Sequence, residues 1–195
     1  MPRVFVLATF NRDKTRELTP LLAGAGITLE TLADHPRATP PAEDGATLLD
    51  NARIKARAAM VLTGKPAIAD DTGLEVDALG GAPGAEAARF AGPDASYADN
   101  VALLLARLAG VPSERRGARF RTVCVACFPD GREMAGEGVL EGRITGTPRG
   151  SEGFGYDPVF ELPDGRTLAE LPAAEKNAIS HRARAVRALA EQLAG

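Results

Sequence analysis

The stretch "GARFRTVCVACFPDGREMAGEGVLEGRIT" (117–145) decides the fold class of this chain. Apolar and β-branched residues fill its two halves, and Asp130-Gly131 between them is a strong hairpin-turn signal. We therefore predict two long strands joined at that turn. Cys124 and Cys127 lie in the first strand, where residues three apart face opposite sides. This spacing favours buried structural cysteines over a redox pair or a zinc site.

Outward from the hairpin, strand-like and helix-like patterns alternate along the chain. They predict, in order, a strand (3–9), a helix (11–26), a strand (27–32), a loop (33–46), helices (48–64 and 96–110), a loop entering a short strand (150–162) and two helical pieces from Pro172 to the end. Asn11, Thr47, Ser96 and Ser180 stand at expected helix N-caps. The alternation followed by a long hairpin predicts an α/β protein with a mixed sheet.

Length and composition describe an ordinary globular chain. Its 195 residues suit a single domain (1–195), or one domain with two lobes, with 45% hydrophobic and 25% charged residues. The net charge of −3 does not favour a protein that coats nucleic acid by charge alone. No apolar run approaches the ~20 residues of a membrane span, and the N-terminus does not resemble a signal peptide. We expect a cytoplasmic protein with no stable nucleic-acid or membrane partner.

The segment "IADDTGLEVDALGGAPG" (68–84) carries the clearest chemical signal. We expect a strand that ends at Asp70 and Asp71, followed by a Thr-Gly turn. Carboxylates beside the Thr72 hydroxyl are oxygen ligands that suit Mg²⁺, and such an aspartate can deprotonate an attacking water. The alternative is an acidic turn with a solvated face.

Three further segments carry side chains that could bind a nucleotide. "ATFNRDK" (8–14) opens a helix, whose free N–H groups favour anions, and Lys14 adds a cation. "GFGYDP" (153–158) holds aromatic rings that could stack on a base, and "EKNAISHRARA" (175–185) clusters cationic residues. Each segment also has a plain structural interpretation, as a capped helix, a loop anchor or a solvated basic face. Together they favour a nucleotide that carries several phosphates.

"TFNRDK", "ADDTGLEVDALGGAPG", "GFGYDPVF" and "EKNAISHR", in this order and spacing, resemble the inosine/xanthosine triphosphate pyrophosphatase family, the dITP/XTP or non-standard purine pyrophosphatases. The resemblance runs from about Val4 into the last helix. It implies a homodimeric α/β protein with an elongated mixed sheet flanked by helices and two lobes around a central cleft. It also implies Mg²⁺-dependent hydrolysis of ITP, dITP and XTP to the monophosphate and pyrophosphate, which removes deaminated purines from the nucleotide pool.

The same resemblance implies roles for individual residues. Asp71 corresponds to the catalytic proton acceptor and a metal ligand. The substrate contacts would come from Thr9, Phe10, Asn11, Arg12, Asp13, Lys14, Thr72, Phe154, Gly155, Tyr156, Asp157, Lys176, His181 and Arg182. Two positions depart from the family pattern: Phe10 stands where a Gly is usual, and Ala42 stands where the first of two glutamates often helps to hold metal. Glu43 or Asp44 could replace that glutamate, or Asp71 and the substrate phosphates could hold the metal with more water; of these we assign Glu43.

Other functions remain open from the sequence. A nucleotide-binding regulator without catalytic activity could use the same contacts. A nucleic-acid-binding protein could use the arginine-rich C-terminal helix, and a hydrolase of modified pyrimidine triphosphates could share the chemistry.

Overall fold

The computed structural model of the protein describes residues 4–194, so Arg3 of the expected first strand lies outside the described residues. The strands are β1 (Val4–Leu7), β2 (Thr28–Thr31), β3 (Ala67–Val76), β4 (Pro83–Gly84), β5 (Gly117–Cys127), β6 (Glu133–Ile144) and β7 (Phe160–Glu161). The α-helices are α1 (Arg12–Gly24), α2 (Leu48–Thr63), α3 (Tyr97–Arg107), α4 (Ala173–Ile179) and α5 (His181–Ala194). Short 3-10 turns are η1 (Leu32–Asp34), η2 (Asp77–Leu79), η3 (Ala85–Arg89), η4 (Ser113–Arg115), η5 (Asp157–Val159) and η6 (Leu168–Glu170).

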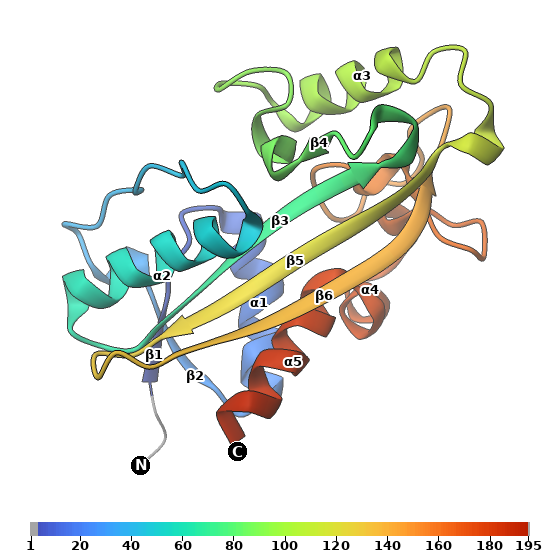
Figure 1. Ribbon diagram of the computed structural model, residues 1–195. Coiled ribbons are helices and arrows are strands. Elements are labelled where there is room, and N and C mark those ends of the chain that lie inside the picture. The colour runs from blue at the N-terminus through green and yellow to red at the C-terminus, as the bar shows by residue number, and fades with distance from the viewer. Residues whose placement is uncertain (1–3, 195) are drawn as a thin grey trace. The chain divides into compact units, whose positions relative to one another are not determined.

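The predicted hairpin is confirmed. β5 and β6 are neighbours in the sheet and run in opposite directions on either side of the turn (Figure 1). Gly131 has a φ of 87°, a left-handed conformation that glycine adopts without strain. Cys124 and Cys127 are buried and free, and burial raises the pKa of the Cys127 thiol to about 11. Neither thiol therefore has the lowered pKa of a reactive cysteine.

Helix starts follow the local capping signals. The Asn11 side-chain oxygen accepts hydrogen bonds from the backbone N–H groups of Asp13 and Lys14, at 2.9 and 3.1 Å. Thr47 and Ser96 cap α2 and α3 in the same way. These caps satisfy N–H groups that have no partner inside the helix, so short polar residues fix where α1, α2 and α3 begin.

The sheet is mixed, as predicted. The strand order is β2-β1-β3-β5-β6-β7, and β4 pairs with β3. β1 pairs in parallel with β2 and β3, whereas β3 with β4 and β6 with β7 are antiparallel. The α/β fold class is therefore confirmed.

The prediction that a strand ends at Asp70 and Asp71 was wrong. β3 continues through both acids and through Thr72 to Val76, with no turn at Thr-Gly. Beyond the acids β3 pairs with β4, with Leu74 opposite Gly84, and β5 is its other neighbour, so its backbone groups find hydrogen-bond partners there. Leu74 and Val76 are fully buried and alternate as strand residues do. Tertiary pairing thus overrides the local turn signal.

The chain forms two compact units. Unit 1 comprises Met1–Asp71, Thr122–Gly138 and His181–Gly195, and unit 2 comprises Thr72–Arg121 and Val139–Ser180. Each has its own hydrophobic core, around Leu18, Ile68 and Leu189 in unit 1 and around Leu104, Phe160 and Leu171 in unit 2. Because the chain crosses between them repeatedly, no composition shift marks a boundary. The cleft expected between two lobes stays a prediction.

Within unit 1, α2 covers one face of the strands, and α1 and α5 cover the other (Figure 1). α5 lies directly on the backbone of β6. A Cβ added to Gly138 would lie 2.1 Å from the carbonyl oxygen of His181 and 2.4 Å from the amide nitrogen of Ala185. Glycine in β6 therefore permits this close packing of helix on strand.

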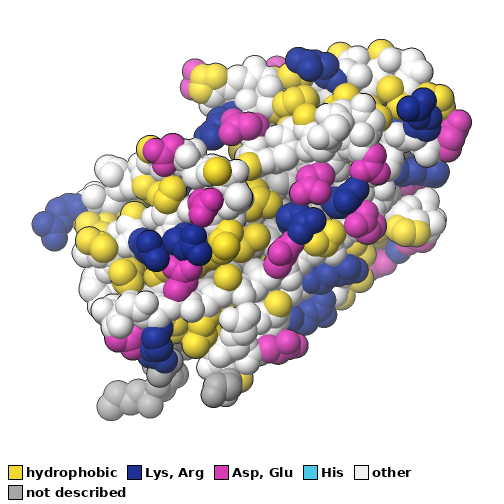
Figure 2. All heavy atoms as spheres, in the orientation of Figure 1, with side chains coloured by type: hydrophobic (Ala, Val, Ile, Leu, Met, Phe, Trp, Pro, Cys, Tyr) yellow, Lys and Arg dark blue, Asp and Glu magenta, His cyan; other side chains and the backbone are white. Residues whose placement is uncertain are grey.

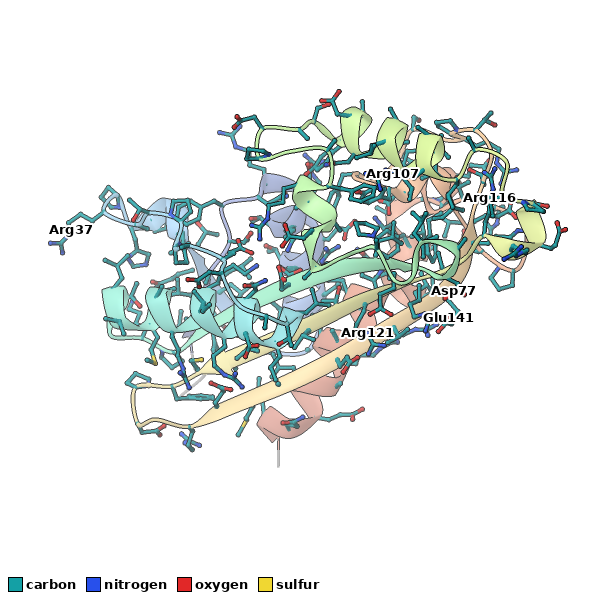
Figure 3. All side chains as sticks on the ribbon, turned by 45° about the horizontal axis from the view of Figure 1, so that its top comes forward. Arg37, Asp77, Arg107, Arg116, Arg121 and Glu141 are labelled. Atoms are coloured by element: carbon teal, nitrogen blue, oxygen red, sulfur yellow. The ribbon has the colours of Figure 1, made fainter. Side chains whose placement is uncertain are left out.

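Within unit 2, ion pairs connect β5 with η2 and β6 through Arg119. Asp77 and Glu141, labelled in Figure 3, both pair with Arg119, at 2.5 and 3.8 Å. On the face that Figure 2 shows, Lys and Arg side chains lie beside Asp and Glu side chains. Across residues 4–194, no helix has the length and apolar character needed to cross a bilayer.

Candidate active site

The candidate site is built around two adjacent carboxylates in the middle of β3. Asp70 is 2% exposed and Asp71 is 6% exposed. Successive residues of a strand point to opposite faces of the sheet, so the two carboxylates meet different helices. A buried carboxylate is costly unless charged or hydrogen-bonding groups compensate it, and each of these has such partners.

Asp70 faces α1 and α5. The Lys14 ammonium lies 3.1 Å from its Oδ1, and the Arg182 Nε donates to its Oδ2 at 3.2 Å. Arg182 also pairs with Glu17, one helical turn after Lys14 on α1. Burial would raise the pKa of Asp70, but the cations of Lys14, Arg182 and Lys55 outweigh it and hold that pKa well below its usual range. Asp70 is thus a permanently charged centre of a buried ionic network.

Asp71 faces α2. The Lys55 ammonium lies 2.7 Å from its Oδ1, and the Asn51 side-chain amide donates to its Oδ2 at 3.4 Å. Lys55 also binds Glu43 at 3.0 Å. Burial raises the pKa of Asp71, with Asp70 adding to the rise, and the cations of Lys55 and Lys14 only partly oppose it. A carboxylate with a raised pKa is better matched to accepting a proton near neutral pH.

Lys55 connects the predicted catalytic acid to the predicted second metal ligand. Burial alone would lower its pKa, but Asp71, Asp70 and Glu43 together raise it, so the ammonium stays charged. Within residues 4–194, no three His, Cys, Asp or Glu side chains converge as a ready metal site. Unit 1 therefore offers two carboxylates, Asp71 and Glu43, gathered on one cationic side chain.

The predicted phosphate segment precedes and opens α1. Asn11 is occupied as the cap, and its backbone N–H donates to the Thr9 hydroxyl at 3.2 Å. These bonds set the direction in which Lys14 leaves the helix toward Asp70. Phe10, between them, is 48% exposed, and Arg12 is also exposed.

Unit 2 holds the second set of predicted residues, in the loop before and through η5. The Asp157 carboxylate accepts from the Phe154 backbone N–H at 2.8 Å and pairs with the ammonium of Lys176. Both side chains of that ion pair are 4% exposed. The Lys176 ammonium also lies 5.2 Å from the centroid of the Phe154 ring, within cation–π range. Gly153 has a φ of 72°, and a Cβ there would lie 2.1 Å from the Asp157 carboxylate.

Tyr156 points into the core of unit 2. It is 5% exposed, its hydroxyl donates to the Ala87 carbonyl at 2.8 Å, and burial raises its pKa. Gly155, beside it, has a φ of 65°, a conformation that favours glycine. Thr72, the first unit 2 residue of β3, is half-buried.

The C-terminal cationic residues, expected as one cluster, pair with different acidic residues in the two units. Lys176 in α4 pairs with Asp157 of unit 2, whereas Arg182 in α5 pairs with Asp70 and Glu17 of unit 1. His181 opens α5 and is 2% exposed. The helical break at Ser180, predicted from its capping chemistry, separates α4 from α5.

Sequence reasoning missed Lys55, Asn51 and Glu17. A signal was present for the first two. They stand four residues apart in "NARIK", on the same helical face as the apolar residues that α2 buries. Paired polar residues on a buried helix face require partners, and Asp71 supplies them.

Asp71, Lys55 and Glu43 together form a candidate site for acid–base chemistry on an anionic substrate. The chain belongs to the Ham1 family, whose family model matches residues 5–192. It is 52% identical to a dITP/XTP pyrophosphatase of Symbiobacterium thermophilum, over 96% of this chain and 93% of that protein. It is 49% identical to one of Geobacillus kaustophilus, over 96% and 92%.

Solved structures agree with this assignment. A HAM1 protein from Coxiella burnetii has a TM-score of 0.88 and 39% identity, covering 98% of each chain. The Ham1 protein of Staphylococcus aureus has a TM-score of 0.87 and 34% identity, covering 99% of each chain. The relatives thus match this chain over nearly its whole length.

Proposed function

We propose that this protein hydrolyses non-standard purine nucleoside triphosphates, namely ITP, dITP and XTP, to the monophosphate and pyrophosphate. Its biological role would be to keep deaminated purines out of the nucleotide pool. The observation that carries the proposal is the Asp71–Lys55–Glu43 arrangement, found in a chain about half identical to proteins named dITP/XTP pyrophosphatases. We further expect a cytoplasmic homodimer with no stable nucleic-acid or membrane partner.

Asp71 is the proposed proton acceptor. It takes a proton from a water whose oxygen attacks the α-phosphorus, and the α–β phosphoanhydride bond breaks as pyrophosphate leaves with the bonding electrons. Its raised pKa supports this role, as does the Asn51 amide that helps to orient the carboxylate. Lys14 and Lys55 are the proposed cationic contacts of the phosphates, together with Thr9–Asp13 and the Thr72 hydroxyl.

Mg²⁺ fits the donors of this site. Magnesium in nucleotide enzymes is typically held by one or two carboxylates, with water and phosphate oxygens completing the coordination. Asp71 and Glu43 would hold it, since both already bind a single cation, the Lys55 ammonium. When bound, the ion offsets negative charge on the phosphate oxygens. Position 42 is Ala42 and supplies no carboxylate, whereas the neighbouring Glu43 binds Lys55.

The proposed base-binding loop consists of Phe154, Gly155, Tyr156 and Asp157, in which Tyr156 anchors the loop in the core. Lys176, His181 and Arg182 are the proposed remaining contacts of the base and the phosphates. Hypoxanthine and xanthine have a 6-oxo acceptor where adenine has a 6-amino donor. Lys176, buried and paired with Asp157, would add a hydrogen bond to the 6-oxo acceptor of hypoxanthine or xanthine, and it cannot make that bond to the 6-amino donor of adenine. A missing hydrogen bond at a buried charged group costs enough to discriminate strongly between substrates.

The test is pyrophosphate release from dITP, XTP, dATP, dGTP and dUTP, each with and without Mg²⁺. We expect Mg²⁺-dependent release from dITP and XTP and little from the other three. Release from dUTP alone would replace the proposal with a pyrimidine hydrolase. Tight dITP binding without release would replace it with a nucleotide-binding regulator.

A further inference from the structure

Tyr97 is an exposed aromatic residue at the start of α3 in unit 2. It follows the Ser96 cap, and 40% of its surface is exposed. The chain has two tyrosines and no tryptophan, and the other tyrosine, Tyr156, is buried in the core. Large aromatic side chains left partly in water often mark binding surfaces.

The Tyr97 ring lies against the ring of Phe154. Their centroids are 5.6 Å apart and the ring planes are tilted by 40°. The Lys176 ammonium lies 5.2 Å from the Phe154 centroid, so Phe154 contacts both an aromatic neighbour and a cation. Tyr97 and Phe154 come from segments more than fifty residues apart, and together we call them the aromatic pair.

Polar contacts at both ends hold α3 in place. Near its start, the buried Asn100 side chain accepts from the Ala91 backbone N–H at 2.8 Å and donates to the Ala88 carbonyl at 3.1 Å. Beyond its end, the Arg116 guanidinium, labelled in Figure 3, donates to the carbonyl oxygens of Leu108, Val111 and Thr145, at 3.0 to 3.1 Å. Tyr97 is therefore presented by a fixed element, which lowers the entropy lost on binding.

We propose that the aromatic pair binds the purine base, with Tyr97 as a base-contacting residue beside Phe154. This inference rests on the proposed function, in which the loop around Phe154 takes the base. Tyr156 is turned into the core and uses its hydroxyl for Ala87, so it does not supply a second exposed ring. Tyr97 does.

Stacking on an aromatic ring is tolerant of base identity, because every purine has a π-face. Tyr97 would therefore strengthen binding of all purine nucleotides, while polar groups such as Lys176 distinguish among them. Its removal should raise KM with little change in kcat, since the contact is equal in the ground state and the transition state.

The test uses the tyrosine fluorescence of the full-length protein during titration with IMP, and separately with pyrophosphate. IMP should change the emission of the wild-type protein, and pyrophosphate should not. Tyr97→Phe, which keeps the ring and removes the fluorescent phenol, should lose that change. Tyr97→Ala should raise KM for dITP and the Kd for IMP by about tenfold, the usual effect of removing one stacking ring. Val61→Ala, which truncates an apolar side chain 77% exposed on α2, is the matched control.

Two results would overturn this inference. One is an IMP-dependent emission change that persists in Tyr97→Phe. The other is an unchanged KM for dITP and Kd for IMP in a folded Tyr97→Ala protein. In either case wild-type release of pyrophosphate from dITP would leave the proposed function intact. Absence of that release in the wild-type protein would instead remove the proposed function.

Discussion

Asp70 and Asp71 are adjacent aspartates whose surroundings shift their pKa values in opposite directions. Asp70 lies between two cations from α1 and α5, whereas Asp71 meets one cation and one amide from α2. Both are buried, and burial is the largest influence on both pKa values. The cations around Asp70 outweigh burial and lower its pKa, whereas those near Asp71 do not outweigh burial and the charge of Asp70, so the pKa of Asp71 is raised.

Strand geometry is the cause of this division. A one-residue step along β3 reverses the face of the sheet, and the helices on the two faces carry different charges. Asp70 is therefore suited to hold Lys14 and Arg182 in position, and Asp71 is suited to react. Asp70 is thus the carboxylate expected to stabilise the fold, and Asp71 is the one proposed to act in the chemistry.

The largest expected effect is on turnover, from Asp71→Asn. We expect pyrophosphate release from dITP to fall by about 10²–10⁴-fold, the usual contribution of a general base. The free energy of unfolding should be unchanged or higher, because asparagine removes a buried charge of raised pKa. Kinetics and urea denaturation of the same preparation measure both. Near-normal turnover would show that Asp71 is not the proton acceptor.

The mirror-image variant, Asp70→Asn, should lower the free energy of unfolding by about 3–5 kcal/mol, because it leaves buried cations without their shared carboxylate. In a chain of this size that corresponds to a fall in Tm of roughly 10 °C. Asp94→Asn, at an exposed position, is the control. A loss below about 1 kcal/mol would place Asp70 among ordinary surface acids, against the geometry described above.

Much of this architecture could be predicted from local signals. The hairpin at Asp130-Gly131 and the caps at Asn11 and Ser96 depend on residues close in sequence, and all are confirmed. The extent of β3 could not be predicted in the same way, because its continuation past Asp71 depends on pairing with β4 and with β5, which is distant in sequence.

The candidate site divides along the same line. The acids stand out in the sequence, as do Lys14 and Arg182, the cations that bind Asp70. The only signal for Lys55 is its spacing from Asn51 on the buried face of α2, and Glu17, which pairs with Arg182, resembles a surface charge. The split between Lys176 and Arg182 is also invisible locally, since they stand six residues apart and pair with Asp157 and Asp70 respectively.

The pH dependence of stability should separate the two carboxyls by sign. The folded-state pKa of Asp70 is lowered, so its stabilisation is fully present above its unfolded pKa of about 3.9 and is lost as the pH falls toward the folded value. The difference in the free energy of unfolding between the wild-type protein and Asp70→Asn should therefore stay constant from pH 7 to 5 and shrink below about pH 4.

Asp71, with a raised pKa, should show the opposite trend. The stabilisation by Asp71 is greatest below its unfolded pKa and is lost as the pH rises through the folded pKa. The free energy of unfolding of Asp71→Asn should therefore rise relative to that of the wild-type protein toward neutral pH. Urea midpoints measured between pH 3.5 and 7 for the three proteins test both trends. If the urea midpoints of the two variants changed with pH in the same way, the opposite roles inferred for Asp70 and Asp71 would be refuted.

The smallest expected effect on the free energy of unfolding comes from Gly138→Ala. This variant would act on Asp70 indirectly, through Arg182 on α5. The added Cβ would lie 2.1 Å from the His181 carbonyl oxygen, so α5 must move away from β6, and Arg182 moves with it. Overpacking of this kind typically costs about 1–3 kcal/mol. Gly146→Ala, with open space around its Cβ, adds the same methyl group as a control.

If the methyl group acts through Arg182 and Asp70, its cost should be smaller in an Asp70→Asn background, because groups that share partners are not additive. Unfolding free energies of the two single variants and the double variant give this coupling directly. Full additivity would mean that Gly138 matters only for packing of α5 on β6. The Asp71 face should be unaffected in either case, since Lys55 and Asn51 are carried by α2, so the Asp71-dependent kcat should stay closer to wild type than stability does.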